Sequence, residues 1–282
     1  MSGLHTVSSA SGVAMPPILY GTAWKKAATA RLVAAALRAG FRGIDTACQP
    51  KHYDEAGVGA GIAACLGEDL RREDLYIQSK FSPPAAHDSA RVPYDPRAPI
   101  SEQVEQSFAV SLANLGVDQL DGLVLHSPLG SRDATLEVWR ALEGIVARGG
   151  ARQIGISNCY SLELLRALYE AAAIKPAIVQ NRFYRDTGYD KALRAYCRER
   201  GIVYQSFWTL TANPQLLSHP TLRAIASRHA RTPAQVLFRY LTQCDVVPLI
   251  GTRSERHMRE DLAILEFELD RNEQQRITWL LD

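Results

Sequence analysis

Polar side chains end five apolar runs in the first two-thirds of the chain. They are Asp45, Lys80, His126, the pair Ser157 and Asn158, and Gln180. Carboxylate, ammonium, imidazole, hydroxyl and amide groups can together transfer a proton and stabilise a developing negative charge. A single histidine at a strand end is more often a hydrogen-bonded structural residue. Five such positions in succession indicate instead that these side chains converge on one site.

Short apolar runs that alternate with helical patterns must position these residues. We predict strands over residues 18–22, 41–46, 75–80, 121–126, 152–158, 177–181, 202–207 and 246–251. Periodicity predicts helices over residues 27–39, 53–66, 101–115 and 135–148, and a further helix that begins near residue 161. The runs are continuously apolar, as in parallel strands that are buried on both faces.

Eight strand–helix units in 282 residues favour an α/β fold of the closed (β/α)₈, or TIM-barrel, class. Active sites of such barrels lie at the C-terminal ends of the strands, where the polar residues fall. No G-x-G-x-x-G follows a predicted strand, which disfavours an open dinucleotide-binding sheet. No linker divides the chain, so we expect one domain over residues 1–282.

Four local signals refine this expectation. Gly40 follows a helical pattern where a C-terminal glycine would end it, and Thr232-Pro233 resembles a helix N-cap with proline at the first helical position. The segment before Ile18, with Ser11-Gly12 as its turn, is predicted to form a β-hairpin that closes the barrel floor. The long irregular segment 82–100 follows a strand, and loops of that length are often functional. We therefore expect it to line a substrate pocket.

Composition excludes several classes of partner. The formal net charge of +2 and the scattered arginines do not predict a surface for nucleic acid or for an anionic membrane. The N-terminal sequence lacks the basic and apolar regions of a signal peptide, and no apolar run is long enough for a membrane span. The five cysteines fit neither a disulfide framework nor a zinc spacing, so we expect a cytoplasmic protein. The seven histidines show no metal-binding spacing, so no metal is expected.

Motifs along almost the whole chain resemble the aldo-keto reductase superfamily. They are GTAW, GIDTA with HYDEAGVG, the lysine of IQSKF, DGLVLHSP, IGISN, the VQN strand and GTRSERHMREDL. The resemblance implies a barrel enzyme that reduces aldehydes or ketones with a nicotinamide cofactor, and a monomer. Its catalytic tyrosine, lysine, aspartate and histidine match Tyr53, Lys80, Asp45 and His126.

The chemistry of carbonyl reduction agrees with this set. Hydride reaches the carbon while a proton reaches the oxygen, and a phenol with a pKa near 10 is a weak acid at neutral pH. A nearby lysine ammonium favours the phenolate, so we expect Lys80 to lower the pKa of Tyr53. Asp45 would hold that ammonium, and His126 would hydrogen-bond the substrate oxygen.

The resemblance also implies the cofactor residues. Ser157, Asn158 and Gln180 match positions that hold the nicotinamide carboxamide, and Phe207 matches the aromatic residue that stacks on the ring. The remaining expected cofactor positions are Gly21, Thr22, Leu210, Gly251, Thr252, Arg253, His257, Glu260 and Asp261. NADPH-preferring relatives carry a lysine in place of Gly251 and an arginine in place of His257. Arg253 can replace their contacts with the 2′-phosphate, so NADPH is favoured and NADH is the alternative.

The tyrosine position departs from the family pattern. The tyrosine usually follows the aspartate by five residues, whereas Tyr53 stands eight positions after Asp45. An ungapped match to E-x-x-V-G would place His52 there instead. Tyr53 is the better choice, because Lys80 and Asp45 make most sense beside a phenol. Lys51 and His52 would then shape the pocket.

The expected substrate pocket is open and aromatic. Its walls are predicted to be Trp24, His52, Phe81, Ser127 and Trp208, with Ser127 standing where relatives often have tryptophan. Such a pocket favours hydrophobic or aromatic carbonyls, although Trp24 and Trp208 are equally well explained as packing residues. Two other functions compete with the reductase: a barrel that binds nicotinamide cofactor as a redox sensor or regulatory subunit, and a barrel enzyme of another class.

Overall fold

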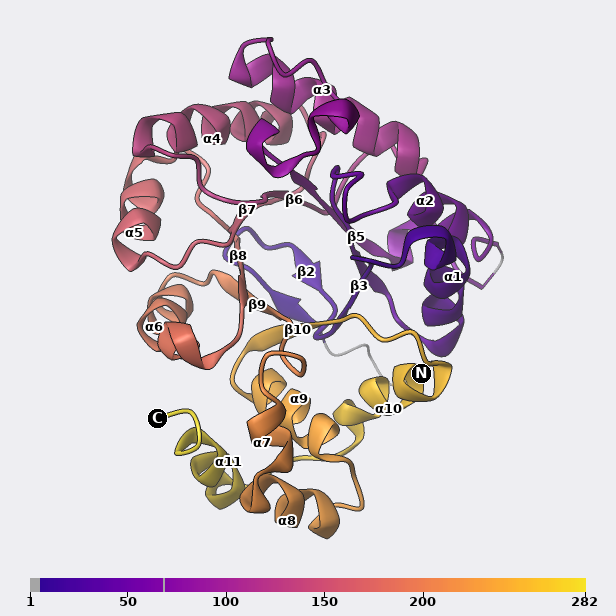
Figure 1. The fold of residues 1–282 in the computed structure, drawn as a ribbon, viewed down its shortest axis with the longest axis vertical. Helices are drawn as coiled ribbons and strands as arrows, with labels where there is room; N and C mark the ends of the chain where they lie inside the picture. Colours follow the sequence, from indigo (N-terminus) through magenta and orange to yellow (C-terminus); the bar gives the residue numbers. More distant parts are fainter. Residues whose placement is uncertain (1–5, 68) are drawn as a thin grey trace.

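A computed structural model describes residues 6–67 and 69–282, and within these ranges eight parallel strands close into a barrel (Figure 1). Strand β10 pairs with both β3 and β9, which completes the ring. The predicted (β/α)₈ fold is therefore confirmed. The barrel strands are β3 (Leu19–Gly21), β4 (Gly43–Asp45), β5 (Tyr76–Phe81), β6 (Gly122–Leu125), β7 (Ile154–Ser157), β8 (Ile178–Arg182), β9 (Val203–Phe207) and β10 (Val246–Ile250).

Helices surround the barrel and bury the outward faces of its strands (Figure 1). The helices are α1 (Thr29–Ala39), α2 (Glu55–Ala63), α3 (Ile100–Leu115), α4 (Arg132–Ala147), α5 (Leu162–Ala171), α6 (Lys191–Glu199), α7 (Pro214–Ser218), α8 (Pro220–Arg228), α9 (Pro233–Gln243), α10 (Glu255–Leu262) and α11 (Arg271–Thr278). In the part of the chain that the structure describes, none of them is long and apolar enough to cross a membrane.

The local signals read from the sequence explain where helices begin and end. Gly40 ends α1 with a φ of 119°, and its N–H donates to the carbonyls of Ala36 and Leu37. Thr232 caps α9: its hydroxyl accepts from the N–H of Gln235, whose side chain accepts from the N–H of Thr232. Both predictions are confirmed, and the other predicted bounds lie within three residues of those observed.

The start of α2 is a correction that bears on the site. The sequence predicted a helix from Tyr53, whereas the helix begins at Glu55. Asp54 is its N-cap, because the carboxylate of Asp54 accepts from the N–H of Gly57 at 2.9 Å. Tyr53 therefore lies in the loop between β4 and α2, outside the helix.

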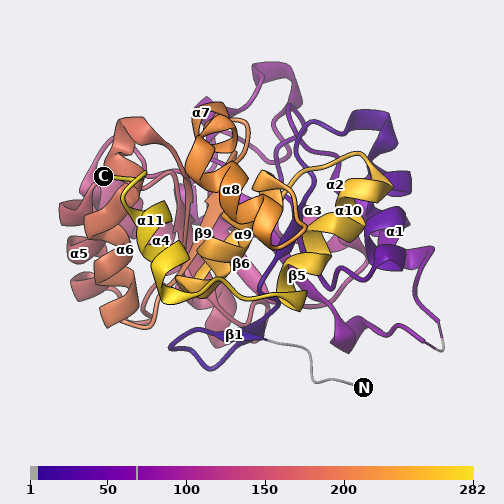
Figure 2. The same cartoon turned by 90° about the horizontal axis from the view of Figure 1, so that it is seen from below.

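The predicted N-terminal hairpin is present and lies at the N-terminal end of the barrel. Strands β1 (Val7–Ser8) and β2 (Ala14–Met15) pair antiparallel, and Gly12 adopts a φ of 75° in the turn. The N–H of Ala10 donates to the carbonyl of Gly201, just before β9. Figure 2 shows the hairpin below the strands, where it covers the barrel floor.

A chain of polar side chains runs up the barrel interior from this floor. Ser9 donates to Gln153 at 2.6 Å, and Gln153 donates to the hydroxyl of Tyr76 at 3.0 Å. Tyr76 donates to Gln78 at 3.0 Å, and Gln78 donates to Asp45 at 2.7 Å. Buried polar groups lose their hydration and are stable only when they are hydrogen-bonded. This network satisfies them and links the hairpin to the C-terminal end of the barrel.

Candidate active site

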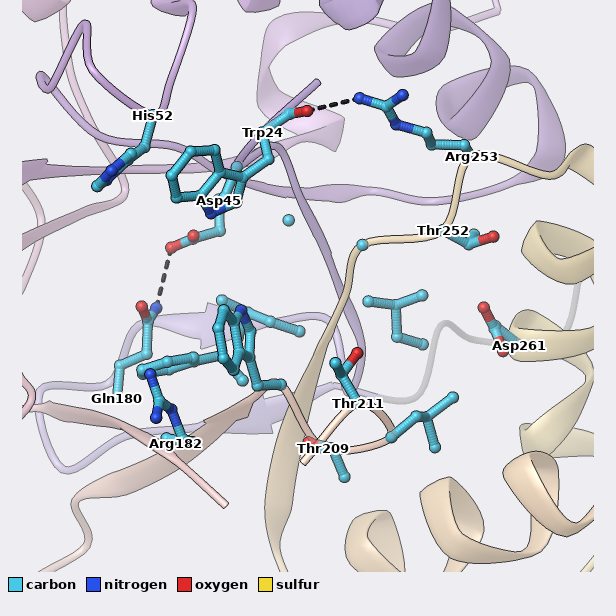
Figure 3. A pocket seen from close by; sticks show the side chains of 18 of the residues that line it. Trp24, Asp45, His52, Gln180, Arg182, Thr209, Thr211, Thr252, Arg253 and Asp261 are labelled. Carbon is cyan, nitrogen blue, oxygen red and sulfur yellow. Dashed lines mark hydrogen bonds between the residues drawn. The ribbon is translucent and has the colours of Figure 1, made fainter. Parts of the chain in front are cut away.

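The C-terminal ends of the strands surround a cavity of about 1070 Å³. Its lining comes from the residues that end or follow the eight strands of the barrel, together with α9 and α10. Figure 3 shows that Asp45, His52 and Gln180 lie at one end of it and Thr252 and Asp261 at the other. Because parallel strands end on one face, residues far apart in the sequence converge here.

The deepest part of the site is the ion pair between Asp45 and Lys80. Both side chains are buried, and Lys80 Nζ lies 2.6 Å from Asp45 Oδ2 and 2.7 Å from the carbonyl of Thr46. The other carboxylate oxygen accepts from Gln78 at 2.7 Å and from Gln180 at 2.9 Å (Figure 3). Burial lowers the pKa of Lys80, and the adjacent carboxylate of Asp45 opposes that shift.

Tyr53 lies beside this ion pair. Lys80 Nζ is 5.2 Å from the centroid of the Tyr53 ring, and the Tyr53 and His126 rings meet edge-on with centroids 5.9 Å apart. The sequence led us to expect that Lys80 lowers the pKa of the phenol. In the structure burial raises that pKa, and the carboxylate of Asp45 adds to the rise. The phenol is therefore protonated at neutral pH.

The first residue of the 82–100 segment, Ser82, supports the side chain of His126. The hydroxyl of Ser82 lies 2.6 Å from His126 Nδ1, and the carbonyl of Ser82 accepts from the hydroxyl of Tyr94 at 2.6 Å. Burial lowers the pKa of His126 well below its usual value, with Lys80 adding to the effect, so the imidazole is neutral. With Nδ1 engaged by Ser82, Nε2 is the ring nitrogen left for a ligand.

The 82–100 segment mostly supports the site and contributes little to its wall. It folds into two short 3₁₀ turns, at Pro84–Ala86 and Ser89–Arg91, and only Ala86 lines the cavity. The expectation that this segment forms the pocket wall is therefore largely wrong.

A tight turn takes up the extra residues before Tyr53. The N–H groups of His52 and Tyr53 both donate to the carbonyl of Gln49, each at 3.0 Å. The His52 ring stacks on Trp24, with centroids 4.0 Å apart, and its Nδ1 lies 2.7 Å from Gln49 Oε1. Lys51 points outward to Asp88. Both Tyr53 and His52 line the cavity, but Tyr53 is the one that contacts Lys80 and His126.

The residues predicted to hold the nicotinamide gather next to this group. Ser157, Asn158, Gln180 and Phe207 all line the cavity. Asn158 has a φ of 53° and donates to the carbonyl of His126 at 2.8 Å, which ties β7 to β6. Gln180 donates to Asp45 and to Gln205 Oε1, each at 2.9 Å. Its amide is thus fixed in orientation.

The predicted adenosine residues lie at the opposite end of the cavity. The lining there includes Gly251, Thr252, Arg253, His257, Glu260 and Asp261, and Gly21 and Leu210 also line the cavity. Arg253 donates to the carbonyl of Trp24 at 2.5 Å and so connects the loop after β10 with the loop after β3 (Figure 3). Burial, followed by the charge of Glu260, raises the pKa of Asp261 to about 7. Thr22 is buried and donates to the carbonyl of Asp45 instead of reaching the cavity.

Two tryptophans flank the cavity. Both line the cavity, with Trp24 49% and Trp208 47% exposed, so neither belongs to the buried core. Their φ values of 62° and 56° are unfavourable for large side chains. Ser127 also lines the cavity, as predicted. The placement of Phe81 is a correction: Phe81 is buried away from the cavity against Tyr94, with ring centroids 5.6 Å apart.

Several cavity or supporting residues escaped the sequence analysis. They are Ser82 behind His126, Gln78 beneath Asp45, and the two cavity arginines Arg182 and Arg256. The alternation of a strand gives a signal for one of them: Arg182 stands two positions after Gln180 and so shares its face. In residues 6–67 and 69–282, no group of three histidine, cysteine or acidic residues is arranged to hold a metal ion.

Comparison with known proteins identifies the family. The model of the "Aldo/keto reductase family" matches residues 12–282. The chain belongs to this family. Its fold and membership together support an oxidoreductase that acts on carbonyl compounds.

The relatives of this aldo-keto reductase cover most of its length. It is 34% identical to the uncharacterized oxidoreductase YtbE of Bacillus subtilis, over 84% of this chain and 78% of that protein. It is 31% identical to a probable NAD(P)H-dependent D-xylose reductase of Aspergillus clavatus, over 98% of this chain and 90% of that protein. The crystal structure of an aldo/keto reductase from Brucella melitensis superimposes with a TM-score of 0.83 at 27% identity, covering 99% of this chain and all of that one.

The neutral His126 predicts how stability depends on pH. Its pKa is lower in the folded protein than in the unfolded chain, so below about pH 6.5 the unfolded chain binds a proton that the folded protein does not. The unfolding free energy should therefore fall by up to about 2 kcal/mol between pH 7 and pH 5 from this residue alone. His126→Asn cannot bind that proton, so urea denaturation should show a flatter pH dependence for this variant. Equal slopes for the two proteins would contradict a neutral His126.

Proposed function

We propose that this enzyme reduces aldehydes or ketones to alcohols with NADPH, using Tyr53 as the proton donor. The observation that carries the proposal is the arrangement of a protonated phenol, a neutral imidazole and a buried ammonium around one end of the cavity. When bound, the dinucleotide supplies the hydride. The protein groups must then orient the carbonyl, donate the proton and stabilise the charge that develops on the oxygen.

The proton would come from the Tyr53 hydroxyl. Burial keeps the phenol protonated, so it is available as an acid over the whole neutral range. The oxygen of a carbonyl that accepts hydride becomes far more basic than a phenolate, which makes the transfer favourable in the transition state. As the proton leaves, the ammonium of Lys80 stabilises the developing phenolate.

His126 would position the carbonyl oxygen. The Ser82 hydroxyl lies 2.6 Å from Nδ1, and if it donates there the neutral imidazole carries its proton on Nε2, which can donate to the substrate oxygen. Such a donor contributes both orientation and stabilisation of the oxyanion. Asp45 would act indirectly, through Lys80: its carboxylate holds the ammonium in place and favours the charged form within a buried environment.

The residues at the two ends of the cavity are suited to binding a nicotinamide dinucleotide. Ser157, Asn158 and Gln180 would hold the carboxamide, and Phe207 would stack on the ring. At the other end, Arg253 immediately precedes Ser254, the N-cap of α10, and Arg256 lies in the first turn of this helix, whose N-terminus is a favourable site for a phosphate. These two cations support NADPH over NADH. His257 adds a hydrogen-bonding group on the same turn, close to Arg256.

The identity of the proton donor is tested by two substitutions. Tyr53→Phe keeps the ring but removes the acid, so kcat should fall by roughly 10²- to 10⁴-fold. His52→Ala should change kcat by less than about threefold, because His52 contacts Trp24 and Gln49 rather than Lys80. Loss of NADPH absorbance with a panel of aldehydes measures both variants. Activity lost only in His52→Ala would assign the proton donor to His52.

The cofactor preference is tested at Arg253. Arg253→Ala removes a charged donor to the 2′-phosphate, so KM for NADPH should rise about tenfold or more, while KM for NADH changes little. The variant also loses the bond to Trp24, but that loss affects both cofactors equally. Arg259→Ala is the matched control, because Arg259 is exposed on α10 outside the cavity lining. Equal rises for NADPH and NADH in Arg253→Ala would exclude this role.

A further inference from the structure

Arg182, the last residue of β8, places a positive charge in the cavity wall that the proposed reaction does not use. Its side chain is partly buried and lines the cavity. Within residues 6–67 and 69–282, no carboxylate pairs with it, and its buried Nε has no hydrogen-bond partner. Burying part of a guanidinium without a counter-charge is unfavourable. The arrangement therefore points to an anion that arrives from outside.

The strand geometry places the charge of Arg182 at the end of the cavity that holds Asp45 and Gln180. Alternate residues of a strand share a face, and Gln180 faces the barrel interior, where it bonds Asp45 and Gln205. Arg182 thus lies on the same face, about 6.6 Å further along the strand toward the mouth. Figure 3 shows Arg182 beside Gln180, across the cavity from Arg253 and Asp261.

Two aromatic rings hold the guanidinium in place. Its central carbon lies 4.3 Å from the Trp208 ring centroid and 5.2 Å from that of Tyr184. At these distances the cation is attracted to the faces of both rings, and the N–H groups of a guanidinium lie within its own plane. Those donors are arranged to bind a carboxylate through two parallel hydrogen bonds.

The other charges of the cavity leave Arg182 without a counter-charge. The acidic residues that line the cavity are Asp45, Glu260 and Asp261. Asp45 is paired with Lys80, and Glu260 lies 3.6 Å from Arg256 on α10. Asp261 lies at the opposite end of the cavity (Figure 3).

We propose that Arg182 binds a carboxylate of the substrate, so that the preferred substrates are carbonyl compounds carrying a negative charge. The proposal rests on the reductase function proposed above and narrows its substrate class. The substrate carbonyl would lie at Tyr53 and His126, its carboxylate at Arg182, and an aromatic or short apolar spacer would lie between them beside Trp208. Arg182 is thereby a specificity-determining residue that leaves the proton transfer itself unchanged.

A matched pair of substrates tests this role. 4-Carboxybenzaldehyde and methyl 4-formylbenzoate present the same aldehyde and ring, and differ in the negative charge. The wild-type enzyme should have at least about a tenfold higher kcat/KM for the acid, and Arg182→Met should lower that value by about 10- to 100-fold. The ester should change by less than about threefold. Arg185→Met is the matched control, since Arg185 is exposed and lies outside the cavity lining.

Equal losses for acid and ester, or a wild-type preference for the ester, would overturn the proposal. A rise in KM for NADPH with both substrates would overturn it too, because Arg182 would then bind the dinucleotide phosphates. Calorimetric titration with benzoate, which has no reducible carbonyl, tests the anion site without turnover. Benzoate should bind Arg182→Met at least about tenfold more weakly than the wild type. Absence of turnover alone contradicts the reductase, whereas equal benzoate affinities contradict the role of Arg182.

Discussion

The buried carboxylate of Asp45 is the interaction on which both the barrel interior and the site depend. It accepts hydrogen bonds from Lys80, Gln78 and Gln180, which belong to two other strands of the barrel. Each partner would lose hydration without compensation if the carboxylate were absent. Removal of one member of such a buried pair costs about 3–5 kcal/mol, because the remaining charge stays unpaired. The ion pair and its amides therefore fix the relative positions of β4, β5 and β8 at the level where the cavity begins.

The same ion pair determines the protonation states around it. Burial lowers the pKa of Lys80 and the carboxylate of Asp45 opposes that shift, while the positive charge of Lys80 helps to lower the pKa of His126. The pKa of the Tyr53 phenol shifts upward, because burial and the carboxylate of Asp45 both raise it. Two neutral donors thus lie beside one buried cation. This combination suits a reaction in which negative charge develops on an oxygen and a proton follows.

The sequence predicted the parts of this arrangement that follow from strand geometry. Asp45, Lys80 and His126 could be placed together because parallel strands end on one face of the barrel. Alternation along a strand explains the error at Phe81: Lys80 points into the barrel, so its neighbour must point outward into the core. The same alternation predicts that Arg182, two residues after Gln180 in β8, points into the barrel as Gln180 does.

Other features depended on contacts that no spacing reveals. The turn at Gln49 accommodates the longer segment before Tyr53, so counting from Asp45 could not decide between Tyr53 and His52. The direction of the pKa shift at Tyr53 depends on the balance between burial and the charge of Lys80, which requires coordinates. The support of His126 by Ser82 likewise appears only when the loop after β5 is folded.

The most direct test of this account is a crystal structure of the protein with NADP⁺ and 4-carboxybenzaldehyde, which cannot be reduced by the oxidised cofactor. We expect the nicotinamide carboxamide at Ser157, Asn158 and Gln180, and the aldehyde oxygen within hydrogen-bonding distance of Tyr53 Oη and His126 Nε2. The Asp45–Lys80 pair should remain intact beneath them. A complex in which His52 contacts that oxygen while Tyr53 points away, or in which the dinucleotide binds outside this cavity, would contradict the account.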